Sequence, residues 1–341
     1  MLYNTLGLAS ACSRYLSITS LPQLQELISE GALIKQPLFI LGGGSNVVLP
    51  AYYEGTILHL DTKGICSHDD TDDASRIFVT AQAGENWNDF VLFCSGKGWY
   101  GLENLVAIPG SVGASPVQNV GAYGVEAKDV ISSVKACDIS TGQERVFTNA
   151  ECQFGYRSSV FKTTLSGKYV VTEVTFHLSR YFEPNLSYKA LAEAVRHETA
   201  SGKTENSLCG AQMDAHNLTD IISRLRWSKL PRPEELGSCG SFFKNPIVTK
   251  AHLDQLLHRY PDMPFFPAGS NSFKIPAAYL IDHAGWKGRR LGSVGVYEKQ
   301  ALVLVNYGGA TAEDVRRLAD AIIADVASLY SVTLTPEAIF V

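Results

Sequence analysis

Two short glycine-rich segments contain the residues whose types and spacing best suit the binding of a ligand. The first reads GGGSN over residues 42–46, between two apolar runs, and the second reads GSVGAS over residues 110–115. Consecutive small residues leave main-chain N–H groups uncovered, so such a loop can surround an anionic oxygen. Two loops are more than one phosphate needs, and we therefore expect them to hold a diphosphate. Either loop alone could equally be an ordinary tight turn.

The standard phosphate and nucleophile motifs do not fit these loops. A dinucleotide fingerprint that starts at Gly42 meets Val47 where its last glycine should stand, and a P-loop would need a glycine at His197. Neither Ser45 nor Ser111 lies in the G-x-S-x-G pattern of a hydrolase nucleophile. The eight histidines form no H-x-x-x-H pair, so we expect no metal at the reaction centre.

A local group of basic residues could meet the same kind of ligand. The formal net charge of −5 gives the chain no general attraction to nucleic acid or to an anionic membrane, so a phosphate must be held locally. The sharpest basic group consists of Arg224, Arg226, Lys229 and Arg232. It could catch a pyrophosphate, or it could be a solvated surface.

The elements that must position these residues follow from hydrophobic periodicity and from capping signals. Ser20 and Gln23 have the capping-box spacing, as do Thr311 and Asp314. We expect helices over residues 20–31, 87–97, 250–259, 277–284 and 311–330. We expect strands over residues 39–41, 47–49, 56–60, 133–138, 169–178, 301–306 and 332–341. Prolines and glycines over residues 226–241 predict a linker, with a domain boundary near Pro231.

Composition limits the class of protein. The 341 residues suffice for two or three domains, 45% of them are apolar, and no window approaches the roughly 18 apolar residues of a membrane span. Seven cysteines without a C-x-x-C pair suit a reducing cytoplasm, and we expect a soluble cytoplasmic monomer. Residues 1–16 lack the basic and apolar parts of a secretory signal, so we interpret them as mature structure.

Several motifs carry a resemblance to a known family. They are NTLGL from Asn4, ILGGGSNVVL from Ile40, AGENW from Ala83, GLENLVAIPGSVGASPVQNVGAYGVE from Gly101, FGYRSSVFK from Phe154, GSFFKNP from Gly240 and TPE from Thr335. Together they resemble the UDP-N-acetylenolpyruvoylglucosamine reductase (MurB) family of peptidoglycan synthesis, nearly end to end. The segment around Tyr188 resembles the longer form of that family, in which a loop closes over the substrate.

The resemblance implies an α+β fold of three domains. Two N-terminal domains of the vanillyl-alcohol-oxidase (PCMH) type, residues 1–63 and 64–230, would form a cradle for non-covalent FAD. A third α+β domain, residues 231–331, would cover the substrate, and residues 332–341 would return to the active site as a strand. The implied cofactor-binding residues are Gly42, Gly43, Gly44, Ser45, Asn46, Gly110, Gly113, Ser115, Pro116, Gln118, Asn119, Gly121, Tyr123 and Val171.

The resemblance also implies the reaction. Hydride would pass from NADPH to FAD, and from flavin N5 to the enolpyruvyl carbon of UDP-N-acetylglucosamine enolpyruvate, which would give UDP-N-acetylmuramate. Arg157 would hold the substrate carboxylate, Ser241 would donate the proton, and Glu337 would stabilise charge nearby. The implied substrate-binding residues are Tyr188, Lys229, Asn245 and Gln300. Relatives usually carry a basic residue where this chain has Ile339.

Other interpretations of these residues stay open at this point. Considered alone, Arg157 could be a solvated arginine, Ser241 a turn serine and Glu337 an exposed carboxylate. The chain could be an FAD oxidase of the same cradle fold that acts on a sugar or a phenol. Such enzymes often attach flavin covalently through His or Cys, and neither glycine loop contains a histidine. A non-catalytic sugar-nucleotide regulator is the third alternative, against which the presence of all three catalytic residues argues.

Overall fold

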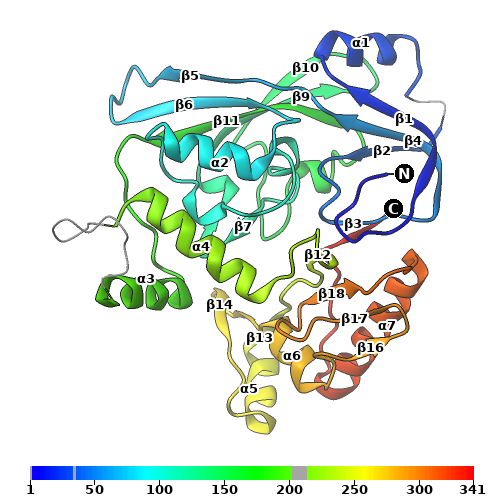
Figure 1. Ribbon diagram of the computed structural model, residues 1–341, viewed down its shortest axis with the longest axis vertical. Helices are drawn as coiled ribbons and strands as arrows, with labels where there is room; N and C mark the ends of the chain where they lie inside the picture. Colours follow the sequence, from blue (N-terminus) through cyan, green and yellow to red (C-terminus); the bar gives the residue numbers. More distant parts are fainter. Residues whose placement is uncertain (1, 34–35, 202–212) are drawn as a thin grey trace. The chain divides into compact units, whose positions relative to one another are not determined.

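The computed structural model describes residues 2–33, 36–201 and 213–341, and its helices and strands follow one another along the chain in an α+β arrangement (Figure 1). The chain divides into two compact units by its internal contacts. Unit 1 comprises Met1–Ala11, Gly44–Tyr53 and Lys229–Val341, and unit 2 comprises Cys12–Gly43 and Glu54–Ser228. The GGGSN loop therefore passes from unit 2 into unit 1. The four predicted domain segments stay predictions.

Unit 2 begins with a three-stranded sheet and a covering helix. The strand order is β1 (Ala11–Ile18), β4 (Tyr52–Leu60) and β2 (Leu38–Leu41), and β2 runs parallel to β4. Helix α1 (Leu21–Ser29) has Ser20 as its N-cap, which confirms the predicted start. Leu24 and Ile28 on one face of α1 pack with Ile18, Leu58 and Leu60 into a core. This packing directs the end of β2 into the GGGSN loop.

A five-stranded antiparallel sheet forms the larger part of unit 2. Its order is β10 (Glu144–Thr148), β9 (Ile131–Asp138), β11 (Tyr169–Ser179), β6 (Arg76–Gln82) and β5 (Ile65–Asp69). Burial alternates along β6, as expected for a strand with one face on the core. Helix α2 (Trp87–Gly96) lies along β6 and β11, and its Trp87 and Phe90 pack against Phe176 (Figure 1). The helix predicted over 87–97 is confirmed.

Short elements and two further helices complete unit 2. The short elements are η1 (Glu103–Leu105), η2 (Val112–Ala114), β7 (Gly121–Ala122), β8 (Val125–Glu126), η3 (Ala127–Asp129) and η4 (Val160–Lys162). The helices are α3 (Lys189–Ser201) and α4 (Ala215–Lys229), and α4 buries Leu218, Ile221 and Ile222. The linker predicted over 226–241 is therefore too long: α4 continues to Lys229, where Pro231 and Pro233 prevent its extension, and the next strand starts at Gly237.

Unit 1 contains a four-stranded and a three-stranded sheet. The first has the order β12 (Gly237–Ser241), β18 (Val303–Asn306), β17 (Val294–Val296) and β16 (Arg290–Leu291). The second has the order β13 (Ile247–Thr249), β15 (Ser272–Lys274) and β14 (Phe266–Gly269). Helices α5 (Lys250–Arg259), α6 (Ala277–His283) and α7 (Ala312–Tyr330) match the predictions, and α7 has the predicted capping box of Thr311 and Asp314.

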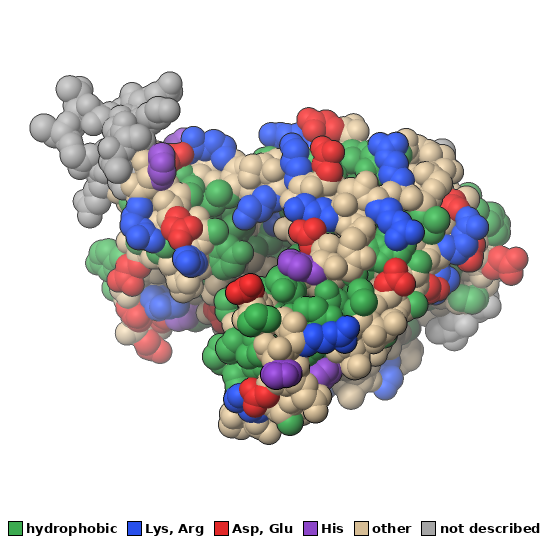
Figure 2. Space-filling view, turned by 90° about the horizontal axis from the view of Figure 1, so that it is seen from below, with side chains coloured by type: hydrophobic (Ala, Val, Ile, Leu, Met, Phe, Trp, Pro, Cys, Tyr) green, Lys and Arg blue, Asp and Glu red, His purple; other side chains and the backbone are tan. Residues whose placement is uncertain are grey.

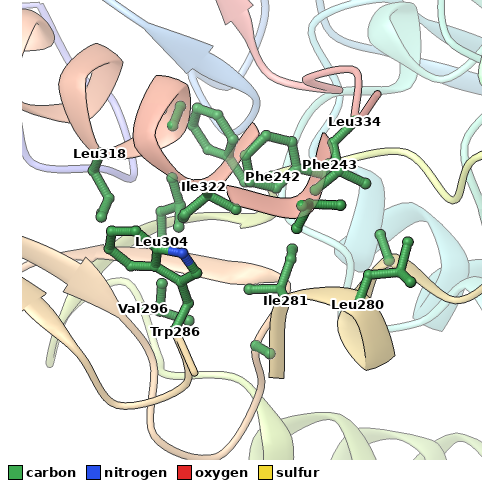
Figure 3. Packing of buried hydrophobic residues seen from close by; sticks show 14 of the residues in the cluster. Phe242, Phe243, Leu280, Ile281, Trp286, Val296, Leu304, Leu318, Ile322 and Leu334 are labelled. Carbon is green, nitrogen blue, oxygen red and sulfur yellow. The ribbon is translucent and has the colours of Figure 1, made fainter. Parts of the chain in front are cut away.

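The core of unit 1 lies directly behind the residue expected to donate the proton. Figure 3 shows Phe242 and Phe243 packed near Leu334, while Trp286 lies among Val296, Leu304, Leu318 and Ile322. The Trp286 indole N–H donates a hydrogen bond to Asp325 at 3.0 Å, which satisfies the polar atom of this buried side chain. The backbone after Ser241 is thereby anchored on a packed core.

The predicted strand over residues 332–341 is wrong in length. Only β19 (Ile339–Phe340) is a strand, and it pairs in parallel with β3 (Val47–Val48). Pro336 lacks an N–H group and so interrupts a continuous ladder. The segment before β19 is held instead by two hydrogen bonds, Lys244 N–H to Thr335 O at 2.9 Å and Glu337 N–H to Phe242 O at 2.7 Å.

Charge is distributed without a dominant sign over the described surface that Figure 2 shows. Lys and Arg side chains lie interspersed with Asp and Glu on that face. Among the described residues, no helix is both long and apolar enough to cross a membrane.

Candidate functional site

The first two residues of the GGGSN loop, Gly42 and Gly43, lie directly against the second glycine-rich loop within unit 2. A Cβ atom at Gly43 would lie 2.8 Å from the Cα atom of Gly110, and one at Gly42 would lie 2.9 Å from Ser111 Oγ. No side chain fits between the main chains at Gly43, so glycine is required there, whereas Gly42 faces the side chains of Ser111 and Ala114. The two predicted phosphate-binding segments are therefore neighbours in space.

Main-chain donors of the first loop are available to a ligand. In the described part of the chain, the N–H groups of Gly43 and Gly44 donate no hydrogen bond. Gly44 has a φ of +64°, and a Cβ atom there would lie 2.5 Å from Tyr3 O, so only glycine fits. Unpaired N–H groups on a bare loop suit the phosphate oxygens of a dinucleotide, which supports the fit of FAD to this cradle.

Most N–H groups of the second loop already donate hydrogen bonds, either within the loop or to the segment around Ala83. Gly113 N–H donates to Ala83 O at 2.9 Å, while the N–H and the hydroxyl of Ser115 both donate to Val112 O, at 3.0 and 2.8 Å. A Cβ atom at Gly113 would lie 2.6 Å from the Cβ atom of Ala83. Gly113 and Ser115 thus shape the loop, and their contact with a cofactor stays a prediction.

Asn119 fixes the turn that carries the predicted catalytic arginine. Its side chain is fully buried, and its amide donates to Glu126 Oε2 and to Gly155 O, both at 3.0 Å. Its Oδ1 atom accepts the N–H of Lys128 at 3.0 Å. All three of these hydrogen bonds of the Asn119 side chain are made to other residues of the protein, which gives Asn119 a structural role next to Arg157.

Arg157 is held in an uncommon backbone conformation. Its φ is +53°, in a tight turn closed by reciprocal hydrogen bonds between Gly155 and Ser158. Its guanidinium donates to Gly121 O at 2.7 Å, and a Cβ atom at Gly121 would lie 3.0 Å from Arg157 Nη1. Gly121 therefore makes room for the guanidinium, and the two residues belong to one local arrangement.

A second arginine approaches the same place from α4. Burial lowers the pKa of the Arg226 guanidinium, and the charge of Arg157 acts in the same direction. The Nε atom of Arg226 is buried and has no hydrogen-bond partner among the described residues. Burial raises the pKa of the nearby Tyr123 hydroxyl, and the rings of Tyr123 and Tyr188 meet edge to face with centroids 5.5 Å apart. An anion would satisfy this group of donors.

The rest of the predicted basic group has other surroundings. Arg224 forms an ion pair with Glu198 at 2.6 Å, so its guanidinium is engaged on a different side of α4 from Arg226. Lys229, the last residue of α4, is exposed. Arg224, Arg226 and Lys229 therefore do not share one environment.

The other predicted cofactor residues occupy varied positions. Pro116 is buried and Gln118 half-buried in the segment after η2, and Val171 is buried on β11 opposite Ala136. Ser45 and Asn46 are half-buried in unit 1. Their contact with a cofactor stays a prediction.

Unit 1 brings Ser241 and Glu337 together. Ser241 is exposed at the end of β12, and Gly240 before it has a φ of +70°. The next residue, Phe242, is fully buried and accepts the N–H of Glu337 at 2.7 Å. Asn46 Nδ2 donates to Glu337 O at 3.3 Å, so the end of the GGGSN loop holds the same segment. The main chain of Glu337 thus pairs with the residue that follows Ser241, although the two belong to distant motifs.

Hydrogen bonds connect two of the predicted substrate residues, Gln300 and Asn245, to the backbone near Ser241. Gln300 Oε1 accepts the N–H of Leu302 at 3.3 Å, and Leu302 O accepts the N–H of Phe242 at 2.7 Å. Asn245 Oδ1 accepts the N–H of Ala277 at 2.9 Å, at the start of α6. Both side chains therefore sit on backbone that is fixed by the elements around Ser241.

The structure shows what surrounds Cys239 and Ile339. Cys239 is buried two residues before Ser241, and burial raises the pKa of its thiol to about 12. Ile339 pairs with Val47 in β19. The guanidinium of Arg316, from α7, lies 4.1 Å from the ring centroid of Phe340, so a basic side chain still reaches β19.

Sequence reasoning missed Asn104. It is buried, and its amide donates to Tyr123 O and to Asn185 O. The only signal in the sequence was its place in the GLENL motif. Among the described residues, no cluster of His, Cys, Asp and Glu could hold a metal ion.

Comparisons with known proteins match both parts of the chain. A model described as an FAD binding domain matches residues 13–148, and one described as the C-terminal domain of UDP-N-acetylenolpyruvoylglucosamine reductase matches residues 232–341. A UDP-N-acetylenolpyruvoylglucosamine reductase from Bdellovibrio bacteriovorus is 45% identical over 337 residues, which are 98% of this chain and 96% of that protein. The chain belongs to the UDP-N-acetylenolpyruvoylglucosamine reductase family. This member of the family is an FAD-dependent oxidoreductase, and the FAD-binding match contains both glycine loops.

Further relatives agree. The reductase of the same name from Neisseria gonorrhoeae is 43% identical and covers 98% of this chain and 94% of its own length. The crystal structure of UDP-N-acetylenolpyruvylglucosamine reductase from Thermus caldophilus has a TM-score of 0.63 at 22% identity and covers 99% of this chain and 95% of its own. That likeness shows the fold.

Proposed function

We propose that this enzyme reduces UDP-N-acetylglucosamine enolpyruvate to UDP-N-acetylmuramate, a precursor of peptidoglycan, with NADPH as hydride donor. The likeness to relatives of that name over 98% of the chain carries the proposal. FAD, when bound, supplies the hydride that reaches the enolpyruvyl group. The protein must then hold the substrate carboxylate and deliver one proton.

Arg157 holds the carboxylate in this proposal, with Arg226 beside it. The forked guanidinium of an arginine binds a carboxylate through two hydrogen bonds. Support comes from the fixed turn at Arg157, from its bond to Gly121 O, and from the buried Nε atom of Arg226 without a partner among the described residues. A carboxylate would also offset the repulsion between the two cations.

Ser241 donates the proton, and Glu337 tunes the surroundings of that donor. A serine hydroxyl is a weak acid, but the carbon next to the carboxylate becomes a strong base once hydride arrives, so a fixed hydroxyl suffices. Buried Phe242 fixes the backbone after Ser241, and the Glu337 main chain is bonded to it. Burial raises the pKa of the neighbouring Cys239 thiol to about 12, so Cys239 offers no nucleophilic thiolate beside Ser241.

The remaining substrate contacts are those that the resemblance to the family implies. The exposed Lys229 and the half-buried Asn245 and Gln300 would bind the sugar nucleotide, and Tyr188, with 45% of its side chain exposed, would cover it. We also propose a monomer in the cytoplasm. In the described part of the chain the six cysteines are free thiols, which suits a reducing compartment.

The two half-reactions test this proposal separately. We expect purified protein to show a flavin absorption spectrum, NADPH to bleach it without oxygen, and the enolpyruvyl compound to restore the colour. In Ser241→Ala, bleaching should continue at the wild-type rate, while restoration by the substrate should slow by about 10²–10⁴-fold, because the general acid is lost. Stopped-flow absorbance of the flavin measures both steps.

Ser238→Ala is the matched control, because Ser238 lies on the same strand but is buried, whereas Ser241 is exposed. Its two half-reactions should match those of the wild type. If the enolpyruvyl compound fails to restore colour to the wild-type protein while dioxygen and a sugar or phenol support turnover, the enzyme is an oxidase. Equal slowing of both steps in Ser241→Ala would remove Ser241 from its role.

A further inference from the structure

Asn104 connects two segments of the chain that lie far apart in the sequence, one at Tyr123 and one at Asn185. One hydrogen bond runs from Asn104 Nδ2 to Tyr123 O at 2.8 Å, and a second runs from the same atom to Asn185 O at 2.9 Å. A primary amide has two donor hydrogens, so these bonds use both. The side chain is only 3% exposed, and therefore water cannot replace either bond at low cost.

Hydrogen bonds also fix the short helix that carries Asn104. Asn104 lies in η1, and both carboxylate oxygens of the adjacent Glu103 accept the N–H of Gly101, at 2.9 and 3.2 Å. Glu103 is buried, and burial raises the pKa of its carboxyl group. The amide of Asn104 therefore projects from a rigid turn.

The segment to which Asn104 donates a hydrogen bond, at Asn185, leads directly to Tyr188. Asn185 Oδ1 accepts the N–H of Ser187 at 3.1 Å and its hydroxyl at 2.7 Å, which makes residues 185–187 a compact turn. A Cβ atom at Gly124 would clash with Ser187 Oγ, so the turn sits on the bare main chain after Tyr123. Tyr188 follows, and its carbonyl accepts the N–H groups that start α3.

Tyr188 itself is weakly packed. Its side chain is 45% exposed, and its ring contact is the edge of Tyr123. An aromatic pair of this kind contributes only about 0.5–1.5 kcal/mol, which does not fix an exposed side chain by itself. The position of Tyr188 relative to Tyr123 must therefore come from the backbone that carries it.

We infer that Asn104 is a positioning residue that latches the Tyr188 segment onto the Tyr123 turn and so sets the place of Tyr188 for substrate binding. The role in substrate binding rests on the proposed function, whereas the latch rests on geometry alone. Loss of the two donors frees the segment to move, so the substrate must then restrain it at a cost in affinity. The transfer of hydride from NADPH to the flavin does not need Tyr188 in place.

The test replaces Asn104 by aspartate, which keeps the shape and removes both donors. In flavin-loaded enzyme, amide hydrogen exchange followed by mass spectrometry should speed up in peptides that span residues 183–192. The KM for the enolpyruvyl substrate should rise about tenfold, as expected when two buried hydrogen bonds no longer order the segment. The rate of flavin reduction by NADPH should stay within about twofold of the wild type.

Asn149→Asp is the matched control. Asn149 Nδ2 also donates to two main-chain carbonyls in unit 2, those of Lys128 and Ile131, at 2.8 and 2.7 Å. The same chemical change there should leave exchange over residues 183–192 and the substrate KM unaltered. If Asn104→Asp does not fold, Asn185→Ala tests the same connection, because it removes the exposed turn that presents the Asn185 carbonyl.

Each outcome decides the matter. Unchanged exchange over residues 183–192 in Asn104→Asp, or in Asn185→Ala when that variant stands in, overturns the latch, whatever the activity. Faster exchange with an unchanged KM overturns the role in substrate binding. If wild-type enzyme does not act on the enolpyruvyl compound, the proposed function fails, while faster exchange in the variant would still support the latch.

Discussion

Left-handed backbone at non-glycine residues gathers around the predicted arginine. Asn119, Tyr123 and Arg157 have φ values of +49°, +49° and +53°, although side chains disfavour this region. Such conformations persist only where neighbours determine them, and they concentrate at functional sites. Here the neighbours are Gly121, whose missing side chain admits the guanidinium, and the fully bonded amide of Asn119.

At the scale of the residue, Cys239 should be unreactive in the folded enzyme. Burial raises the pKa of its thiol to about 12, so at pH 8 nearly all of the thiol is protonated, and only 4% of the residue is exposed to a reagent. Labelling with iodoacetamide, followed by mass spectrometry, should modify the exposed Cys66 at least about tenfold faster than Cys239. Equal labelling rates would contradict the packing around Ser241.

At the scale of the element, the start of α7 holds the core of unit 1. Thr311 Oγ1 accepts the N–H of Asp314 at 3.2 Å, and Asp314 Oδ2 accepts the N–H of Thr311 at 2.9 Å. Leu318 and Ile322 on this helix are fully buried near Trp286 (Figure 3). Correct capping therefore fixes the helix against which the strands behind Ser241 pack.

Thr311→Ala should lower the free energy of unfolding by about 1 kcal/mol, because an N-cap side chain contributes roughly that amount. Urea denaturation followed by circular dichroism measures the change. Thr311→Ser keeps the hydroxyl and should lose only a small part of it. A loss of the same size in both variants would show that the methyl group, and not the cap, stabilises this end of α7.

At the scale of the whole molecule, FAD should stabilise the fold. Binding to the native state alone adds about 2.7 kcal/mol at a free concentration one hundred times the dissociation constant. We expect flavin removal to lower the midpoint of thermal unfolding, measured by tryptophan fluorescence, and added FAD to restore it. FMN has one phosphate and no adenylate, so at equal concentration it should restore less. Equal restoration by FMN would contradict a cradle for a diphosphate.

The sequence by itself determined what local chemistry and motif order can determine. The helix starts at Ser20 and Thr311 follow from capping residues next to amphipathic runs, and the two glycine loops follow from runs of small residues. The mostly polar helix α4 was not predicted. The last strand was predicted too long, since Pro336 interrupts the pairing and leaves only β19 as a strand. Local patterns do not report what an element packs against.

Only the tertiary structure decided which residues meet. The approach of Gly43 to Gly110, the bond between Glu337 and Phe242, and the grip of Asn104 on Asn185 all join segments that are distant in the chain. Buried polar groups must find partners wherever the fold brings them, and that pairing depends on packing among all the elements of a unit, which spacing along the sequence does not encode.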